Sequence, residues 1–385
     1  MIVTIAADVL GEENNGTTIA CMNLIRYLKS CGDTVRVICP DKKREGQEGF
    51  YIVKTLNLGF IINKLVKKNN VTIAKPDETI IRKAVTGADI VHIMMPFPVG
   101  NCTARIAREL GIPITAGFHC QAENFSSHIF MFMNSSFFNK AVYKHFYKKL
   151  YQYVDAVHYP TEFIRNLFEK TVGHKTNGHV ISNGVNEAYK YAPAEKPERL
   201  KDSFIILFTG RYAKEKSHTL LVKAVGKSKY KDKIRLIFAG DGPRRMQILR
   251  AVRKAGIPVP IMKFFSRKQL AHILNYADLY CHPAEVEIEA IACLEAISCG
   301  LVPIINNSPR CATKAFALDE RSLFDHNDPE DLARKIDFFI EHDDIRREYS
   351  KRYLASAYAA SQKDCMVMMR QMLCDTIEAK RSSGK

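Results

Sequence analysis

This sequence lacks the features that identify a nucleic-acid-binding, membrane-spanning or secreted protein. It contains no tryptophan, and no RNA-binding aromatic signature of the Lys-Gly-Phe-Gly-Phe type is present, which argues against a nucleic-acid partner. No run of about 18 uncharged apolar residues occurs, so no membrane-spanning helix is expected. Met1 leads directly into an apolar run without the basic segment and cleavage pattern of a signal peptide, which favours a protein that stays in the cytoplasm.

Cysteine is present but not in a pairing pattern. The 11 cysteines include no Cys-x-x-Cys pair, and most of them lie in apolar runs, as Cys39, Cys281 and Cys293 do. Buried, reduced thiols are therefore expected rather than disulfides or a zinc site. The sequence predicts no metal site.

Acidic residues are fewer than basic ones. The chain has 57 Lys and Arg against 41 Asp and Glu, a formal net charge of +16. Such an excess implies an anionic partner, which can be a nucleic acid, an acidic membrane surface or a phosphorylated ligand, and charge alone does not choose among them.

Short β-rich runs alternate with helical patterns along the whole chain, which is the rhythm of parallel α/β sheets. The expected strands are 2–7, 34–39, 89–94 and 112–117, then 204–209, 234–239, 279–281 and 301–305. The polar segment 189–199 carries two prolines and separates the two series. We expect two doubly wound Rossmann-like domains that face a cleft, over 1–192 and 200–355, joined by a linker at 193–199. A C-terminal helix within 356–385 is expected to pack back on the first domain and to end in a disordered tail.

Two glutamates lie in the second half of the chain within an apolar helical pattern. The pattern predicts a helix from Ile288 to Gly300, with Glu287 at its start and Glu295 inside it. Eight residues of helix span about 12 Å and turn about 80° off face, so the two carboxylates suit the two ends of a long ligand. Carboxylates accept hydrogen bonds from sugar hydroxyls, and a helix start suits a diphosphate, so a nucleotide sugar fits. For this segment alone, an acidic solvated helix start is the alternative.

Cations follow the strand expected over 204–209. Gly210 and Arg211 end this strand, and Lys216 comes shortly before the next helical pattern. The C-terminal edge of a parallel sheet is where phosphate binds, and a guanidinium with an ammonium can neutralise both charges of a diphosphate. A basic loop on a basic protein is the alternative.

The first half of the chain adds two further signals. Asn15 and Gly16 open a helix after the first strand, where a glycine lets the backbone approach a phosphate or sugar closely. His119 follows the strand expected over 112–117, and taken alone it is more often explained as a core histidine.

Taken together and in this order, these segments resemble the family-four retaining glycosyltransferases of the GT-B fold, and the resemblance covers nearly the whole chain. It rests on Gly16, His119, Val-Ile-Ser-Asn-Gly-Val at 180–185, Gly210-Arg211 with Lys216, Gly-Asp-Gly-Pro at 240–243, and the spaced glutamates. The resemblance implies transfer of a sugar from a nucleotide sugar with retained anomeric configuration and without an obligatory metal.

The resemblance also implies roles for individual residues. Arg211 and Lys216 hold the diphosphate, Glu287 contacts the donor-sugar hydroxyls, Glu295 contacts the ribose, and His119 lies beside the reacting sugar. The remaining expected donor contacts are Asn15, Gly16, Gly210, Ile288, Glu289 and Ala290. Since no acidic residue of the first-half motifs is placed as a nucleophile, we expect front-face departure, with cations stabilising the leaving diphosphate.

The sequence departs from the family pattern at two places. The family often has a Phe-Gly pair where this chain has Glu289-Ala290, so the backbone approach to the phosphate is expected to differ slightly. The usual double glycine of the first loop is reduced to Asn15-Gly16, and Asn tolerates the required backbone angles better than most residues.

Two stretches rich in lysine and aromatic residues, 50–76 and 125–154, contain no acidic residue. Basic, aromatic, amphipathic segments suit the headgroup layer of a membrane, although core-facing helices with solvated lysines are the alternative. This part looks like the lipid glycosyltransferases of the family, which act on diacylglycerol or related lipids. The expected membrane and acceptor residues are Lys64, Lys67, Lys68, Gln121, Asn124, Lys140, Lys144, Lys148 and Lys149.

The sequence therefore predicts an enzyme that moves a hexose, glucose or galactose, from a UDP-sugar to a membrane lipid such as diacylglycerol or a sphingolipid. Its partners would be the nucleotide sugar, the lipid acceptor and the anionic inner face of the cell membrane, to which it would bind peripherally. A glycosyltransferase that extends a cell-surface polysaccharide or a lipid-linked oligosaccharide is the nearest rival. A non-catalytic nucleotide-sugar binding protein is the rival from another class.

Overall fold

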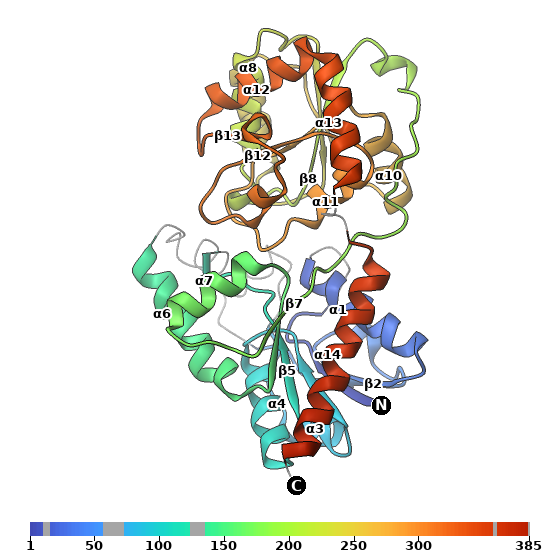
Figure 1. Ribbon diagram of the computed structural model, residues 1–385, viewed down its shortest axis with the longest axis vertical. Coiled ribbons are helices and arrows are strands. Elements are labelled where there is room, and N and C mark those ends of the chain that lie inside the picture. The colour runs from blue at the N-terminus through green and yellow to red at the C-terminus, as the bar shows by residue number, and fades with distance from the viewer. Residues whose placement is uncertain (11–15, 57–72, 124–134, 357–359, 384–385) are drawn as a thin grey trace. The chain divides into compact units, whose positions relative to one another are not determined.

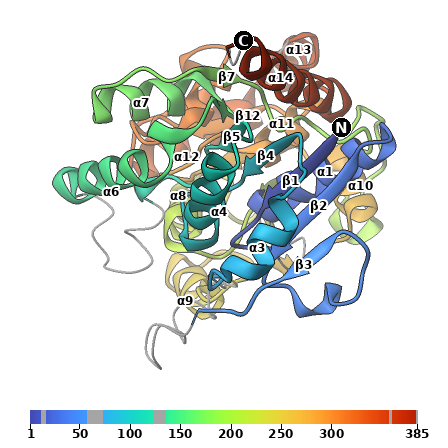
Figure 2. The same ribbon diagram turned by 90° about the horizontal axis from the view of Figure 1, so that it is seen from below.

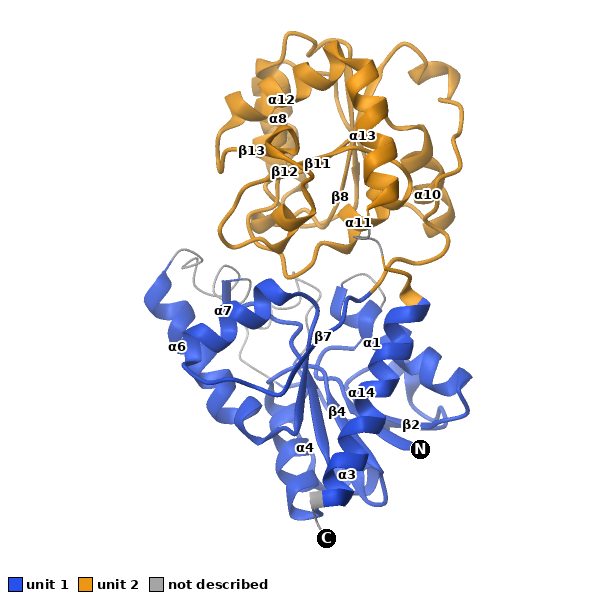
Figure 3. Ribbon diagram, in the orientation of Figure 1, with its two compact units in different colours: residues 1–183, 363–385 blue, residues 184–362 orange. Residues whose placement is uncertain are grey.

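The structure is a computed structural model that describes residues 1–10, 16–56, 73–123, 135–356 and 360–383 (Figure 1). The chain forms two compact units, residues 1–183 with 363–385 and residues 184–362 (Figure 3). Five residues singled out in the sequence lie outside the described part: Asn15, Lys64, Lys67, Lys68 and Asn124.

Unit 1 is built on a parallel sheet of seven strands in the order β3-β2-β1-β4-β5-β6-β7. The strands are β1 Ile2–Ala6, β2 Thr34–Cys39, β3 Phe50–Ile52, β4 Ile90–Ile93, β5 Ile114–Gly117, β6 Ala156–Tyr159 and β7 Gly178–Val180. Every residue of β4, β5 and β6 is buried, because helices cover both faces of a parallel sheet and its inner strands need apolar side chains on both sides.

Helices pack on this sheet as the sequence patterns require. They are α1 Gly16–Ser30, α3 Glu78–Val85, α4 Pro98–Glu109, α6 Ser136–Lys149, α7 Glu162–Val172 and α14 Gln362–Ser383, with short 3-10 helices η1 Lys42–Arg44 and η2 Tyr151–Tyr153. The side chains of Asp77, Ser135 and Thr161 accept the N-terminal N–H bonds of α3, α6 and α7, which explains where these helices begin.

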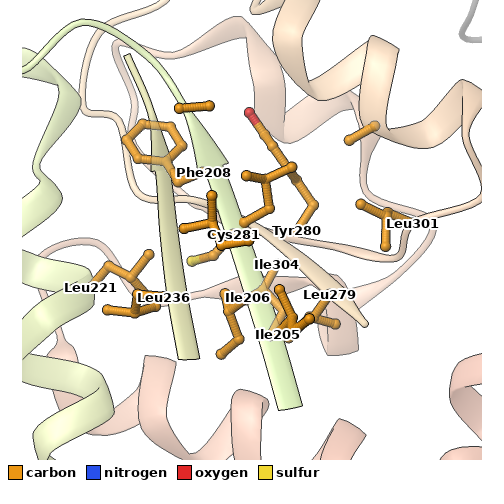
Figure 4. Packing of buried hydrophobic residues seen from close by; sticks show 14 of the residues in the cluster. Ile205, Ile206, Phe208, Leu221, Leu236, Leu279, Tyr280, Cys281, Leu301 and Ile304 are labelled. Atoms are coloured by element: carbon orange, nitrogen blue, oxygen red, sulfur yellow. The ribbon is translucent and has the colours of Figure 1, made fainter. Parts of the chain in front are cut away.

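Unit 2 has a second parallel sheet, of six strands in the order β10-β9-β8-β11-β12-β13. The strands are β8 Phe204–Thr209, β9 Ile234–Ala239, β10 Ile261–Lys263, β11 Leu279–His282, β12 Pro303–Asn306 and β13 Leu323–Phe324. Ile205, Phe208 and Cys281 belong to the buried apolar cluster along its central strands (Figure 4). The direction of chain progression reverses between β8 and β11, and ligands of doubly wound folds bind at such a switch point.

The helices of unit 2 are α8 His218–Lys227, α9 Arg245–Ala255, α10 Arg267–Tyr276, α11 Ile291–Ser298, α12 Pro329–Glu341 and α13 Asp343–Ala355. Its 3-10 helices are η3 Glu198–Leu200, η4 Lys214–Lys216, η5 Ala312–Phe316 and η6 Glu320–Ser322. Ser266 and Gln269 form a capping box at the start of α10, and Gly256 in left-handed conformation ends α9.

The eight strands expected from the sequence are present, and the doubly wound α/β class is confirmed for both units. The units divide between Asn183 and Gly184, however, earlier than the expected boundary at 192, and residues 193–199 are not a free linker. The Oδ1 atom of Asn275 accepts a 2.6 Å hydrogen bond from the Ala192 N–H. Lys196 Nζ lies 2.6 Å from the Asp278 carboxylate. These contacts hold the segment on unit 2.

The C-terminal helix α14 belongs to unit 1 over residues 363–383 (Figure 3). Arg370 forms a bidentate pair with Asp33, at 2.8 and 3.1 Å, and Lys380 lies 2.9 Å from Asp155. The described helices include none that combines the length and apolar composition a membrane span requires. All 11 cysteines are free thiols and seven of them are buried, as expected.

Candidate functional site

Charged side chains gather after the C-terminal ends of β8 and β11, at the switch point of unit 2. Lys216, the last residue of η4, forms an ion pair with Glu287, which lies in the irregular segment after β11. A parallel bridge between Glu287 and Cys311 fixes the backbone of this segment. The Glu287 side chain is only 13% exposed, so the pair is largely shielded from water.

His282 ends β11 and lies behind this ion pair. Its Nε2 is 3.5 Å from Glu287 Oε1, too far for a good hydrogen bond, and neither ring nitrogen has a hydrogen-bond partner among the described residues. Burial lowers the pKa of His282, only partly offset by the nearby Glu287, so the ring is neutral. Burial alone would raise the pKa of Glu287, but Lys216 and His282 outweigh it and lower that pKa to about 2. Glu287 is therefore ionised at neutral pH.

Two further ion pairs adjoin this one. Arg211 Nη2 lies 3.3 Å from Glu215 Oε1. Arg310, which follows β12, places Nη2 3.2 Å from Glu285 Oε2. The Glu285 N–H donates to the Glu215 carbonyl at 2.8 Å, which ties the pairs together. Two of the three cations, Arg211 and Lys216, thus follow β8, and Arg310 follows β12. The carboxylates of Glu285 and Glu287 follow β11, which lies between these two strands.

The sequence prediction was wrong about where the following helix begins. α11 starts at Ile291 rather than Ile288, because Ala290 before it adopts a left-handed conformation at φ 58° and ψ 57°. Glu287 therefore precedes the helix, and the helical spacing argued for Glu287 and Glu295 does not apply. Ala290 stands where the resembled family often has glycine, and its φ shows why that position favours glycine. The expected donor contacts Ile288 and Glu289 lie between Glu287 and this turn.

Glu295 lies on α11 and differs from Glu287 in its surroundings. Burial raises the pKa of Glu295 to about 8, and the nearby Arg267 lowers it only in part. Among the residues that the structure describes, none donates a hydrogen bond to its carboxylate. A ligand hydroxyl would supply the donor that this acceptor lacks.

In unit 1, His119 follows β5 and lies beside two other histidines. The His119 and His158 ring centroids are 5.3 Å apart, and His92 is the third member of this histidine cluster. His158 Nε2 is 2.7 Å from the Ile181 carbonyl, an acceptor, so Nε2 carries the proton. Burial lowers the pKa of all three, so the cluster is neutral. A Cβ on Gly117 would lie 2.4 Å from His119 Nε2, so the ring position depends on glycine there.

The remaining expected residues of unit 1 are partly described. Gly16 begins α1 with open space where a Cβ would stand, and Gln121 is buried. On α6 all four expected lysines are exposed: Lys140, Lys144, Lys148 and Lys149. Phe137 on the same helix is 86% exposed, whereas Tyr143 and Phe146 belong to the core. α6 is thus an amphipathic helix with a basic outer face, and part of the aromatic content of its stretch serves packing.

Sequence reasoning missed His282, Glu285 and Arg310. Arg310 carries no local motif and pairs with Glu285 across 25 residues, so only the fold reveals it. Within the described residues, no group of three or more His, Cys, Asp or Glu side chains is arranged to hold a metal ion.

Comparison with known proteins identifies the family of both halves of the chain. A family model described as "Glycosyl transferases group 1" matches residues 192–354, and one described as "Glycosyltransferase Family 4" matches residues 14–189. The chain belongs to the glycosyltransferases that these two models describe. The two matched ranges meet at 189–192, close to the boundary between the units.

Two curated relatives of this glycosyltransferase have names that give different sugars, glucose and mannose. The alpha-monoglucosyldiacylglycerol synthase of Acholeplasma laidlawii is 23% identical over 369 residues, 90% of this chain and 92% of the relative. A GDP-mannose-dependent alpha-mannosyltransferase of Corynebacterium glutamicum is 24% identical over 330 residues, 79% of this chain and 72% of the relative.

Two solved structures are also similar to this glycosyltransferase. The catalytic domain of the cholesterol-alpha-glucosyltransferase from Helicobacter pylori is 46% identical, covering 39% of this chain and 94% of that domain, with a TM-score of 0.38. Anabaena HepE in complex with UDP and glucose is 14% identical, covering 97% of this chain and 100% of that one, with a TM-score of 0.74. The second likeness assigns the fold to the GT-B class.

Proposed function

We propose that this glycosyltransferase moves a hexose, glucose or galactose, from a UDP-sugar to a membrane lipid such as diacylglycerol or a sphingolipid, with retention of anomeric configuration. The observation that carries the proposal is the partly buried Lys216–Glu287 pair at the switch point of unit 2, with neutral His282 behind it. It combines a cation for the diphosphate with an acceptor for sugar hydroxyls that is ionised at neutral pH.

The donor would bind by exchanging partners within the cluster of ion pairs. Arg211 and Lys216 are held by Glu215 and Glu287 in the free protein, and a diphosphate offers both cations stronger, charge-assisted contacts. Released from Lys216, Glu287 would accept hydrogen bonds from the sugar hydroxyls. At the other end of the ligand, Glu295 would accept from the ribose.

The reaction breaks the bond between the anomeric carbon and the diphosphate oxygen and forms a bond from that carbon to the oxygen of the acceptor hydroxyl, whose proton passes to the leaving diphosphate. Negative charge develops on the leaving group as the first bond breaks. Arg211 and Lys216 would stabilise that charge, so we propose that no metal ion is required. His119, which is neutral, would contact the reacting sugar without adding a competing charge. Transfer should therefore continue in excess EDTA, and a product with inverted anomeric configuration by NMR would reject the retaining mechanism.

Two observations support a lipid acceptor. The basic outer face of α6 with exposed Phe137 suits the headgroup layer of an anionic membrane. The Acholeplasma relative, a diacylglycerol glucosyltransferase by name, aligns over most of both chains. Because one relative is GDP-mannose-dependent by name, GDP-mannose is the second donor to be tested.

A donor panel with membrane-lipid vesicles tests the proposal. UDP-glucose, UDP-galactose and GDP-mannose are each incubated with the protein and with diacylglycerol, sphingolipid or oligosaccharide acceptors, and products are identified by mass spectrometry. Lys216→Ala should slow transfer by about two orders of magnitude, the scale for removing one charge-stabilising group. Wild-type turnover and UDP affinity in this variant would reject the donor site. Transfer to oligosaccharide alone would reject the lipid acceptor.

The α6 face is tested separately with liposomes. Changing Lys144, Lys148 and Lys149 together to Glu should abolish sedimentation with anionic liposomes and leave donor hydrolysis intact, because these side chains are exposed. The matched control changes three exposed lysines elsewhere in unit 1, Lys42, Lys83 and Lys170, to Glu. Equal loss of binding in both variants would show that net charge, not α6, is responsible.

A further inference from the structure

The excess positive charge of unit 2 lies in one segment. Between Gly242 and Ala277 the chain has eight Lys and Arg and no Asp or Glu. The rest of unit 2, within 184–362, has 22 basic and 23 acidic residues. The excess of basic residues is therefore confined to this segment, and the rest of unit 2 has nearly equal numbers of basic and acidic residues.

This segment forms one edge of the unit 2 sheet. It comprises α9, the terminal strand β10 and the helix α10. Met246, Arg250, Arg253 and Lys254 recur at helical spacings of three and four, so they share one face of α9. All four are exposed, whereas Ile248 and Val252 are buried on the opposite face. The helix α8 lies beside α9 (Figure 2).

None of the eight basic side chains forms an ion pair with any residue that the structure describes, although Arg267 lies near enough to Glu295 to lower the pKa of that carboxyl. On the adjacent α8, by contrast, Lys227 lies 2.8 Å from Glu330, and beyond its end Lys229 lies 3.1 Å from Glu341. Clustered like charges repel one another and do not help the fold, so this arrangement indicates an anionic partner.

Exposed apolar side chains accompany the cations. Val259, just before β10, is 72% exposed, and Phe264, just after it, is 68% exposed. Met246 on α9 is 57% exposed. Phosphate groups of a nucleic acid would explain the cations only, whereas a lipid surface also accommodates the apolar side chains below its head groups.

We propose that this edge, formed by Met246, Arg250, Arg253, Lys254, Val259 and Phe264, is a membrane-docking surface of unit 2 that binds anionic lipid head groups. The α9–β10 edge supplies cations for the head groups, and Val259 and Phe264 enter the interface between head groups and acyl chains. The inference is independent of α6 and does not require that the sugar acceptor be a lipid, since it stands on the charge and exposure of unit 2 alone.

The absence of tryptophan provides a direct test in the full-length protein. Val259→Trp introduces a single reporter, whose emission should shift to the blue with phosphatidylglycerol vesicles and much less with phosphatidylcholine vesicles. Leu354→Trp, a partly exposed position on α13, is the matched control and should not shift. An equal shift of both reporters, or no shift at Val259→Trp, overturns the proposal.

Affinity is measured with a second set of variants. Changing Arg250, Arg253 and Lys254 together to Gln should lower the partition coefficient onto phosphatidylglycerol vesicles on the order of 100-fold, since each cation near an anionic surface contributes about fivefold. A control that changes Lys231, Lys233 and Lys351 to Gln removes the same charge elsewhere in unit 2. UDP affinity should stay unchanged in both, which keeps this test separate from the donor site. Equal effects of the two triple variants, or tighter binding of single-stranded RNA than of vesicles, overturn the proposal.

Discussion

Removing the Lys216 ammonium should reverse the way in which Glu287 contributes to stability as pH changes. In the wild type, a Glu287 pKa of about 2 against the ordinary 4.5 corresponds to about 3 kcal/mol of stabilisation at pH 7. Because this pKa is lowered, the contribution is fully present above pH 4.5 and is lost as pH falls toward 2.

In Lys216→Met, burial becomes the main influence on Glu287 and raises its pKa above the ordinary value. The variant should then lose stability as pH rises above 4.5. In the wild type, the contribution of Glu287 to the free energy of unfolding is constant over the same pH range. Leaving one member of a buried pair without its partner costs about 3–5 kcal/mol, so we expect a loss of this size at pH 7. The loss should shrink as pH falls.

Hydrogen exchange of the β8 and β9 amides reports global unfolding of unit 2 and can be followed from pH 5 to pH 8. Lys214→Met, in the same 3-10 helix but without an ion pair among the described residues, is the matched control and should cost less than about 1 kcal/mol. Adding Glu287→Gln to Lys216→Met should restore a flat pH dependence. If Lys216→Met loses the same free energy at every pH, Glu287 does not carry the charge assigned to it.

Three further predictions follow from other residues. UDP affinity should rise by up to about tenfold from pH 7 to pH 9, because the free Glu295 carboxyl titrates near 8 and its ionised form accepts more strongly from the ribose hydroxyls than its protonated form. Calorimetry should show no such rise for Glu295→Gln, and a rise in that variant too would exclude Glu295 as the cause. Ala290→Val should lower the free energy of unfolding by about 2 kcal/mol or more in denaturant titrations, because a β-branched residue is strained in the left-handed conformation of Ala290. Ala290→Gly should stay within about 1 kcal/mol of the wild type. A tolerated valine would contradict the left-handed conformation. Unit 1 should lose stability below pH 6.5, since its histidine cluster is neutral when folded and protonates when unfolded. His158→Phe should reduce the proton uptake on unfolding by about one. An unchanged slope of the unfolding free energy against pH in this variant would count against a buried neutral ring.

The fold was predictable wherever a strand is a mostly apolar run, as β8 is and as β9 is apart from Arg235. The strands β3, β7, β10 and β13 were not predicted, because two or three residues carry too little pattern to separate them from turns. The strand β6 was also missed, although β4, β5, β11 and β12 have the same length of four residues and were predicted. Apolar periodicity likewise placed the start of α11 too early, since the left-handed turn at Ala290 depends on tertiary contacts. Motifs in the sequence pointed to Lys216, Glu287 and His119 as site residues. No motif points to His282, Arg310 or His158, because their contacts are with neighbours from distant parts of the chain.

The course of α14 sets an order for folding during synthesis. Residues 363–383 contribute to unit 1, but the ribosome makes them only after the whole of unit 2. Unit 2 can fold as soon as its own residues emerge, whereas the earlier part of unit 1 must wait with the site of α14 uncovered, including Asp33, which later binds Arg370. A nascent chain stalled before residue 363 should therefore hold a folded unit 2 and an incomplete unit 1, although unit 1 was begun first.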